Sequence, residues 1–116
     1  MIARNVSNQK IIADKLELAI SLAERTRGLI GRKTFEAGSG LLIKRSGNAI
    51  HTCFMSFPID LAFLDKKGRV RWVKHNVHPW AFVFAPIFTN TDCLELPAGI
   101  LKNTETKVGD IIHVES

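Results

Sequence analysis

The sequence has little that would place this protein in a membrane or direct it across one. None of its apolar runs approaches the roughly 20 residues that a helix needs to cross a bilayer. Its first ten residues, MIARNVSNQK, lack the hydrophobic segment of a secretory signal. We therefore expect a soluble, cytoplasmic protein for the chain as written, with an extracytoplasmic location as the alternative if it is a processed form.

Cysteine is scarce, and its spacing excludes two common roles. The chain has two cysteines, Cys53 and Cys93, and no Cys-x-x-Cys spacing that would indicate a structural zinc site or a redox motif. Both lie in apolar runs, which predicts buried thiols. A disulfide between them requires an oxidising compartment and neighbouring strands.

The signatures of several enzyme classes are also missing. No Gly-x-Ser-x-Gly elbow is present, and the Gly-x-Gly at 38–40 lacks the rest of a phosphate-binding motif, so it predicts a turn. His51, Cys53 and Met55 alternate as soft-metal ligands would, but three side chains along one strand lie too far apart to close a metal site. We predict no catalytic nucleophile, no metal and no cofactor.

The charge balance is basic, which raises the question of nucleic-acid binding. The net charge is +5 and the pI is near 9.6, and the densest basic patch is KKGRVRWVK at 66–74. In a strand, Arg69 and Arg71 would lie on the face opposite Trp72, which is typical of a solvated outer face. No nucleic-acid-binding signature accompanies the patch. We expect no nucleic-acid partner, and weak binding through Arg69, Arg71 and Lys74 is the third of our hypotheses.

Strand-like segments separated by turn signals fill most of the chain, without repeats or linkers. Ser21 and Glu24 form a capping box that predicts a helix over 22–30, which Gly31 would end. The pattern predicts a single domain, residues 1–116, that is mainly β (β-rich α+β): a small, partly closed β-barrel or curved sheet with one short helix packed on it. The expected strands are 10–19 (as one or two), 41–43, 50–55, 59–64, 69–74, 81–85, 93–96 and 107–114. The strands at 50–55, 59–64 and 69–74 are expected to form a meander.

An ordered set of short motifs resembles the family called domain of unknown function 192. These motifs are RTRGLIGR at 25–32, GLL at 40–42, His51-Thr52 with Met55, FPID at 57–60, FLD at 63–65 with Gly68, PW at 79–80, LEL at 94–96, AG at 98–99 and GD at 109–110. The resemblance covers nearly the whole chain from about Leu16. It implies a compact β-rich fold with a short helix, and it implies no particular reaction.

Asp60 is the most unusual residue, because it interrupts the apolar run PIDLAFL. An ionised carboxylate that leaves water without a partner costs several kcal/mol. It could cap the turn at 57–58 or pair with an arginine, which is a structural role. It could instead form a polar pocket with His51, Thr52 and Asp65. Asp60 and Asp65 point to opposite faces of a regular strand, so that pocket requires the strand to bend or end there.

Two further residues extend the candidate site. Glu95 alternates with apolar neighbours, and the turn at 97–99 should place it near an edge of the sheet, where it is solvated or faces Arg25. Trp80 follows Pro79 in a loop, where an exposed indole is a platform for a sugar ring or another protein. A plug that closes the end of the barrel is the alternative role for this indole.

These observations favour a small non-catalytic binding or accessory domain with a shallow polar site. The candidate binding residues are Arg25, His51, Thr52, Asp60, Asp65, Trp80 and Glu95, and the expected ligand is a carbohydrate or a protein. The alternative is a hydrolase-type enzyme that uses Asp60 and His51 as an acid/base pair.

Overall fold

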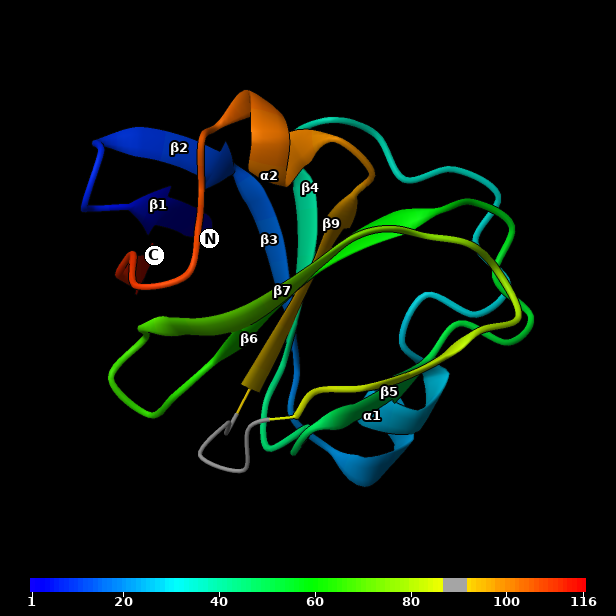
Figure 1. Ribbon diagram of the computed structural model, residues 1–116. Helices are drawn as coiled ribbons and strands as arrows, with labels where there is room; N and C mark the ends of the chain where they lie inside the picture. Colours follow the sequence, from blue (N-terminus) through cyan, green and yellow to red (C-terminus); the bar gives the residue numbers. More distant parts are fainter. Residues whose placement is uncertain (87–91) are drawn as a thin grey trace.

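A computed structural model describes residues 1–86 and 92–116 of the chain, and this part holds ten strands and two short helices (Figure 1). In chain order, the elements are β1 (Ile2–Asn5), β2 (Lys10–Ala13), β3 (Lys15–Ala19), α1 (Leu22–Arg27), β4 (Ser39–Ile43), β5 (Ala49–His51), β6 (Ile59–Leu64), β7 (Val70–Val77), β8 (Phe82–Phe84), β9 (Asp92–Pro97), α2 (Ile100–Asn103) and β10 (Ile112–Glu115). No helix in the described ranges is long and apolar enough to cross a membrane.

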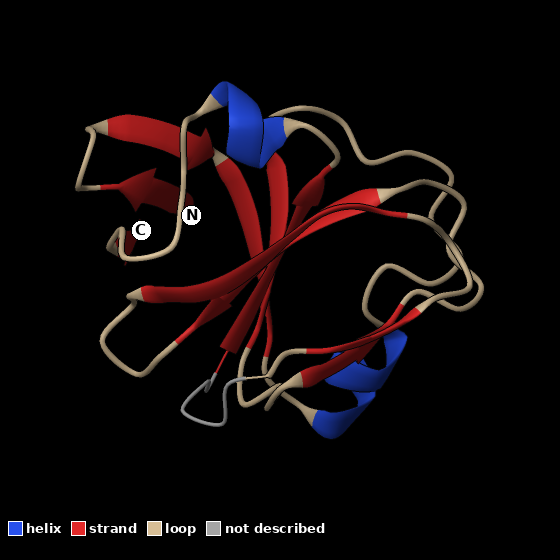
Figure 2. Cartoon of the chain, viewed as in Figure 1, coloured by secondary structure: helices blue, strands red, loops and turns tan. Residues whose placement is uncertain are grey.

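A five-stranded sheet in the order β3-β4-β9-β6-β7 forms the centre of the molecule. Only β3 and β4 are parallel, and α1 lies in the connection between them, as parallel neighbours require a crossover. A three-stranded sheet, β10-β1-β2, lies at one end together with both chain termini, and the two-stranded ribbon β5-β8 lies at the other end near α1 (Figures 1 and 2).

The two faces of the central sheet carry separate hydrophobic clusters. Successive side chains of a strand point to opposite faces, so Ala62 and Leu64 of β6 join one cluster, while Leu61 and Phe63 join the other. The first cluster includes residues of β1, β2, β10 and α2. The second includes residues of β5 and β8 and Leu29, which follows α1, and the candidate site lies on this side.

The prediction of a mainly β protein is confirmed, but the sheets do not close into a barrel, and two short helices are present where one was expected. The strand at 59–64 is confirmed residue for residue, and its predicted pairing with the strand that follows is correct. The other half of the meander is wrong, because β5 pairs with β8 and not with β6. The strand expected at 50–55 ends at His51, where the chain turns and Phe54 takes a left-handed φ of 65°.

The helix α1 begins as its sequence predicts and ends sooner. The Ser21 side chain accepts a hydrogen bond from the Glu24 amide, and the Glu24 carboxylate accepts one from the Ser21 amide. The helix ends at Arg27 because Gly28, with φ 48°, already leaves the helical conformation before Gly31 is reached.

The cysteine prediction holds in part. Cys93 is buried, as expected, whereas Cys53 is half-buried beyond the end of β5, and both thiols are free. Burial, reinforced by nearby Glu95 and Asp92, raises the pKa of the Cys93 thiol well above its ordinary value, so this thiol stays protonated.

Candidate functional site

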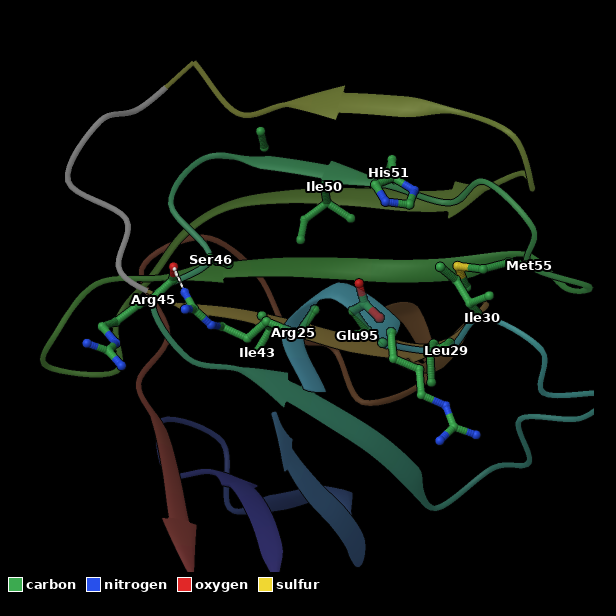
Figure 3. Close-up of a pocket in the computed structure, with 13 residues that line it drawn as sticks. Arg25, Leu29, Ile30, Ile43, Arg45, Ser46, Ile50, His51, Met55 and Glu95 are labelled. Atoms are coloured by element: carbon green, nitrogen blue, oxygen red, sulfur yellow. Dashed lines mark hydrogen bonds between the residues drawn. The ribbon is translucent and has the colours of Figure 1, made fainter. Parts of the chain in front are cut away.

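A cavity of about 300 Å³ lies between the second face of the central sheet, the end of α1 and the strand β5 (Figure 3). Its wall is apolar and its rim is basic. Leu29, Ile43, Ile50 and Met55 supply apolar surface, and Arg25, Arg27 and Arg45 supply the basic groups; Gly28, Ile30, Ser46, Ala49, His51 and Glu95 complete the lining. Three of the predicted site residues, Arg25, His51 and Glu95, therefore meet at this cavity.

Glu95 lies at the base of the cavity and is 3% exposed. It belongs to β9, the middle strand of the sheet, where it pairs in register with Leu41 on one side and Leu61 on the other. The expectation that Glu95 lies near an edge of the sheet is therefore wrong, because strands cover both sides of β9. In Figure 3, Glu95 and Ile50 point into the cavity from opposite sides.

Among the described side chains and backbone groups, none is hydrogen-bonded to the carboxyl group of Glu95, which is almost inaccessible to solvent. Burial raises its pKa to about 8, against a smaller opposing effect of the Arg32 charge. At neutral pH, Glu95 is therefore mostly a neutral carboxylic acid that can donate as well as accept a hydrogen bond.

Arg25 is held in place by only part of its guanidinium group. Its Nη1 donates to the backbone carbonyl of Arg45 at 3.2 Å, and the Arg45 amide in turn donates to Asp92 Oδ1 at 2.9 Å. The Nε of Arg25 is buried and has no acceptor. The side chain of Arg45 extends away from Glu95 (Figure 3). Among the described residues, the cavity thus has an acidic group without a partner, Glu95, and a basic group, Arg25, that has one partner but an unused Nε donor.

Asp60 is fully buried, and backbone amides surround its carboxylate. Its Oδ1 accepts a hydrogen bond from the amide of Asn76 at 2.9 Å, and its Oδ2 accepts from the amides of Gly99 and Leu101, each at 3.0 Å. These contacts join β6 to the end of β7 and to the first turn of α2. The structure does not bring Asp60 to the cavity, and its partners are neither the turn at 57–58 nor an arginine.

Thr52 and Asp65 also lie away from the cavity and support the backbone. The Thr52 hydroxyl donates to the carbonyl of His78 at 2.7 Å and accepts from the amide of Ala81 at 2.8 Å, so it joins the end of β5 to the start of β8. The Asp65 carboxylate accepts from the amides of Lys67 and Arg69 and shapes the turn between β6 and β7.

The predicted acid/base pair does not form, because Asp60 and His51 lie in different parts of the molecule. His51 is exposed, and its Nδ1 accepts a hydrogen bond from the Cys53 amide at 3.2 Å. Across the ranges 1–86 and 92–116, no group of three or more acidic, cysteine or histidine side chains is arranged to hold a metal.

Trp80 does not plug the sheet, because 62% of its side chain is exposed. It contacts Phe54, which is equally exposed, with ring centroids 4.5 Å apart and planes inclined at 57°. Both residues have a left-handed backbone, with φ of 64° and 65°, which is costly for bulky side chains. Phe82 and Phe84 of β8 are 68% and 69% exposed and extend this aromatic surface.

The sequence interpretation missed the apolar wall of the cavity and two of its arginines. Arg27 was visible in the motif RTRG, where it follows Arg25 by two residues. Arg45 lay in a loop without a distinctive pattern. Ile43 and Ile50 could be recognised only as strand residues, because alternation predicts the face of a strand and not its neighbours in space.

Comparison with known proteins agrees with this fold. The family model DUF192, described as Uncharacterized ACR, matches residues 3–114. A crystal structure from Sinorhizobium meliloti 1021, provisionally described as a transcription regulator, is 23% identical with a TM-score of 0.83, and the match covers 97% of this chain and 89% of that one. A protein of unknown function from Novosphingobium aromaticivorans DSM 12444 is 22% identical with a TM-score of 0.84, covering 97% and 82%. No protein with a curated description matches the chain. At these identities, the two structures establish the fold alone.

Proposed function

Because the chain belongs to the DUF192 family, a family without an established function, we propose its function from its own residues. The protein is a binding domain for a small organic ligand, and the cavity between α1, β5 and β9 is the binding site. This proposal keeps Arg25, His51 and Glu95 from the set predicted by the sequence, and it assigns Thr52, Asp60 and Asp65 to the support of the fold.

Glu95 carries the proposal. An ionisable group that is largely removed from water and has no hydrogen-bond partner in the protein destabilises the fold, so such groups are uncommon in native structures. Glu95 is 3% exposed and has no partner in the described part of the chain. A ligand that supplies one offsets this cost and thereby gains affinity. The apolar wall and the few inward-facing polar groups are typical of small-molecule sites, although the volume is at the low end of their range.

The proposal is tested by nuclear magnetic resonance titration with a panel of small probes, namely hexanoate, 1-hexanol and hexylamine. Binding should shift the amide resonances of Leu29, Ile43 and Ile50 first. Ile50→Trp places a large ring in the cavity and should abolish the response. Val108→Trp adds the same ring at an exposed position and should leave the response unchanged. No shift with any probe, or an equal response in Ile50→Trp, would contradict the proposal.

The aromatic surface on the outer side of β5-β8 supports a second candidate function, which is self-association. Within the described residues, β8 pairs with β5 alone. Phe82 lies opposite His51 and Phe84 lies opposite Ala49 in this ribbon. At these positions the backbone N–H and C=O groups of both phenylalanines point away from β5, to the free edge. Residues 46–59 and 75–86 contain no Asp, Glu, Lys or Arg. Charged side chains usually prevent an edge strand from pairing with another molecule, and this edge has none. Two copies can therefore meet there without contacts between like charges, despite the net charge of +5.

Analytical ultracentrifugation tests this candidate directly. We expect the wild type to sediment as a dimer at high concentration and Phe84→Lys to sediment as a monomer, because a charge at the centre of the contact is costly to bury. Val108→Lys places the same charge at another exposed apolar position and should stay dimeric. A wild type that is monomeric at every concentration would exclude self-association.

A further inference from the structure

The cavity contains a carboxyl group without a hydrogen-bond partner among the described residues and a guanidinium group with one donor, Nε, that has no acceptor. Nε of Arg25 has no acceptor, Glu95 has no partner, and no ion pair within 4 Å joins them in the described part of the structure. Figure 3 shows both side chains at the same cavity, Glu95 from β9 and Arg25 from α1. A ligand group that contacts both would have to lie between these two side chains.

The charges around the cavity select the sign of that group. Arg25, Arg27 and Arg45 line it, and Glu95 is the only acid among the described residues of the lining. Arginine keeps its positive charge throughout the working range of pH, so the rim attracts anions and repels cations. Burial raises the pKa of Glu95 to about 8, and at neutral pH this residue offers an O–H donor. Both unpaired groups therefore call for a hydrogen-bond acceptor.

The size and wall of the cavity restrict the remainder of the ligand. The volume of about 300 Å³ is at the low end of the range for small-molecule sites, which favours a small ligand. Leu29, Ile43, Ile50 and Met55 have no polar side-chain group to offer except the weakly accepting thioether, so they favour a hydrocarbon part.

We infer that the cavity binds a small aliphatic monocarboxylate, whose carboxylate accepts hydrogen bonds from Arg25 and Glu95 while its chain lies against the apolar wall. This inference rests on the proposed function of the same cavity and adds the chemical class of the ligand. A carboxylate matches a guanidinium group and forms charge-assisted hydrogen bonds, which are about twice as strong as neutral ones. It also forms a strong hydrogen bond with a neutral carboxylic acid.

Competition between probes of equal chain length tests the class of ligand. At pH 7, we expect hexanoate to bind on the order of tenfold more tightly than 1-hexanol or hexylamine, since only the carboxylate carries a negative charge that pairs with the Arg25 guanidinium. Inorganic phosphate lacks the chain and should bind more weakly than hexanoate. Equal or tighter binding of the alcohol, the amine or phosphate in the cavity overturns the inference and leaves the proposed function standing. No binding of any probe overturns both.

The pH dependence of hexanoate binding tests the role of Glu95. If only its neutral form donates to the carboxylate, affinity falls as pH rises through about 8, and at pH 9.5 it is roughly 30-fold lower than at pH 7. The other charged or titratable groups around Glu95 are Arg25 and Arg27 of the lining, Arg32, His51 across the cavity and Cys93 on its own strand, while the side chain of Arg45 extends away from it.

Three variants separate these groups. Glu95→Gln keeps a donor without the titration, so its affinity should stay flat from pH 7 to 9.5. Glu95→Leu removes the donor and should lower the affinity at pH 7 by about tenfold. His75→Gln replaces an exposed histidine outside the lining and should keep the wild-type profile. A flat wild-type profile, or a fall that persists in Glu95→Gln, overturns the inference.

Discussion

The unpaired acid at the base of the cavity predicts an unusual dependence of stability on pH. The unfolded chain releases the Glu95 proton near the ordinary pKa of 4.5, whereas the folded protein retains it up to about 8. Between these values the folded state binds one proton more than the unfolded state, so the free energy of unfolding falls as pH rises. The contribution of the bound Glu95 proton to the free energy of unfolding is fully present below pH 4.5 and is lost above about pH 8.

The magnitude follows from the two pKa values. Each unit of difference corresponds to about 1.4 kcal/mol, so a difference of about 3.5 units amounts to about 5 kcal/mol between pH 4.5 and pH 8. Relaxation of the site and entry of water reduce this value, and we expect at least half of it to be measured. Such a change is a large fraction of the 5–15 kcal/mol that stabilises a typical domain.

Urea unfolding of the wild type and of Glu95→Gln at pH 5, 6, 7 and 8 measures the effect. The buffers must contain no small carboxylates, because the proposed ligand class would stabilise the folded state. The variant should gain stability relative to the wild type by about 0.7–1.4 kcal/mol for each pH unit. Glu36→Gln, which replaces an exposed carboxylate, should give a curve parallel to the wild type. Parallel curves for Glu95→Gln and the wild type would refute the reasoning.

Two further predictions concern the fold that supports the site. Asp60→Ala should destabilise the protein by at least about 3 kcal/mol in urea unfolding, because it leaves three amides around a fully buried side chain without an acceptor. Below its melting temperature the variant should still bind probes in the cavity, and a stable Asp60→Ala would contradict the structural role. Gly68→Ala should lower the free energy of unfolding by at least about 2 kcal/mol, because φ is +84° and an added Cβ would lie 2.5 Å from the carbonyl oxygen of Ile112. The control Gly47→Ala, with φ +69° and open space around it, should lower it by only about 1 kcal/mol, the cost of a left-handed backbone. Equal melting temperatures for the two alanine variants would show that the contact with Ile112 is relieved at little cost.

Asp60 and Glu95 show why burial alone does not identify a functional acid. Both lie within strands of the same sheet, and both are almost inaccessible to solvent. Three backbone amides complete the hydrogen bonding of Asp60, so its presence is explained by the fold. Nothing in the described residues does the same for Glu95. A group that a fold retains at a cost to its stability is expected at sites of function.

The sequence by itself determined the local features of the protein. Pro58 and the turn at 65–68 bound the strand at 59–64, which the structure reproduces without a shift. Ser21 and Glu24 determined where α1 begins, because both halves of a capping box lie within one turn. The ordered motifs along the chain also sufficed to recognise the family. Each of these features depends on residues that are close in the chain.

The tertiary structure alone decided which distant segments meet. Alternation predicts which face a strand residue occupies, but it does not predict which strand lies beside it. Glu95 was expected near an edge and lies in the middle strand, because β9 pairs with β4 and β6 from far earlier in the chain. Asp60 finds its amides 16, 39 and 41 residues away. The cavity exists because that pairing brings α1, β5 and β9 together, and strand pairing over such distances depends on the packing of the whole core.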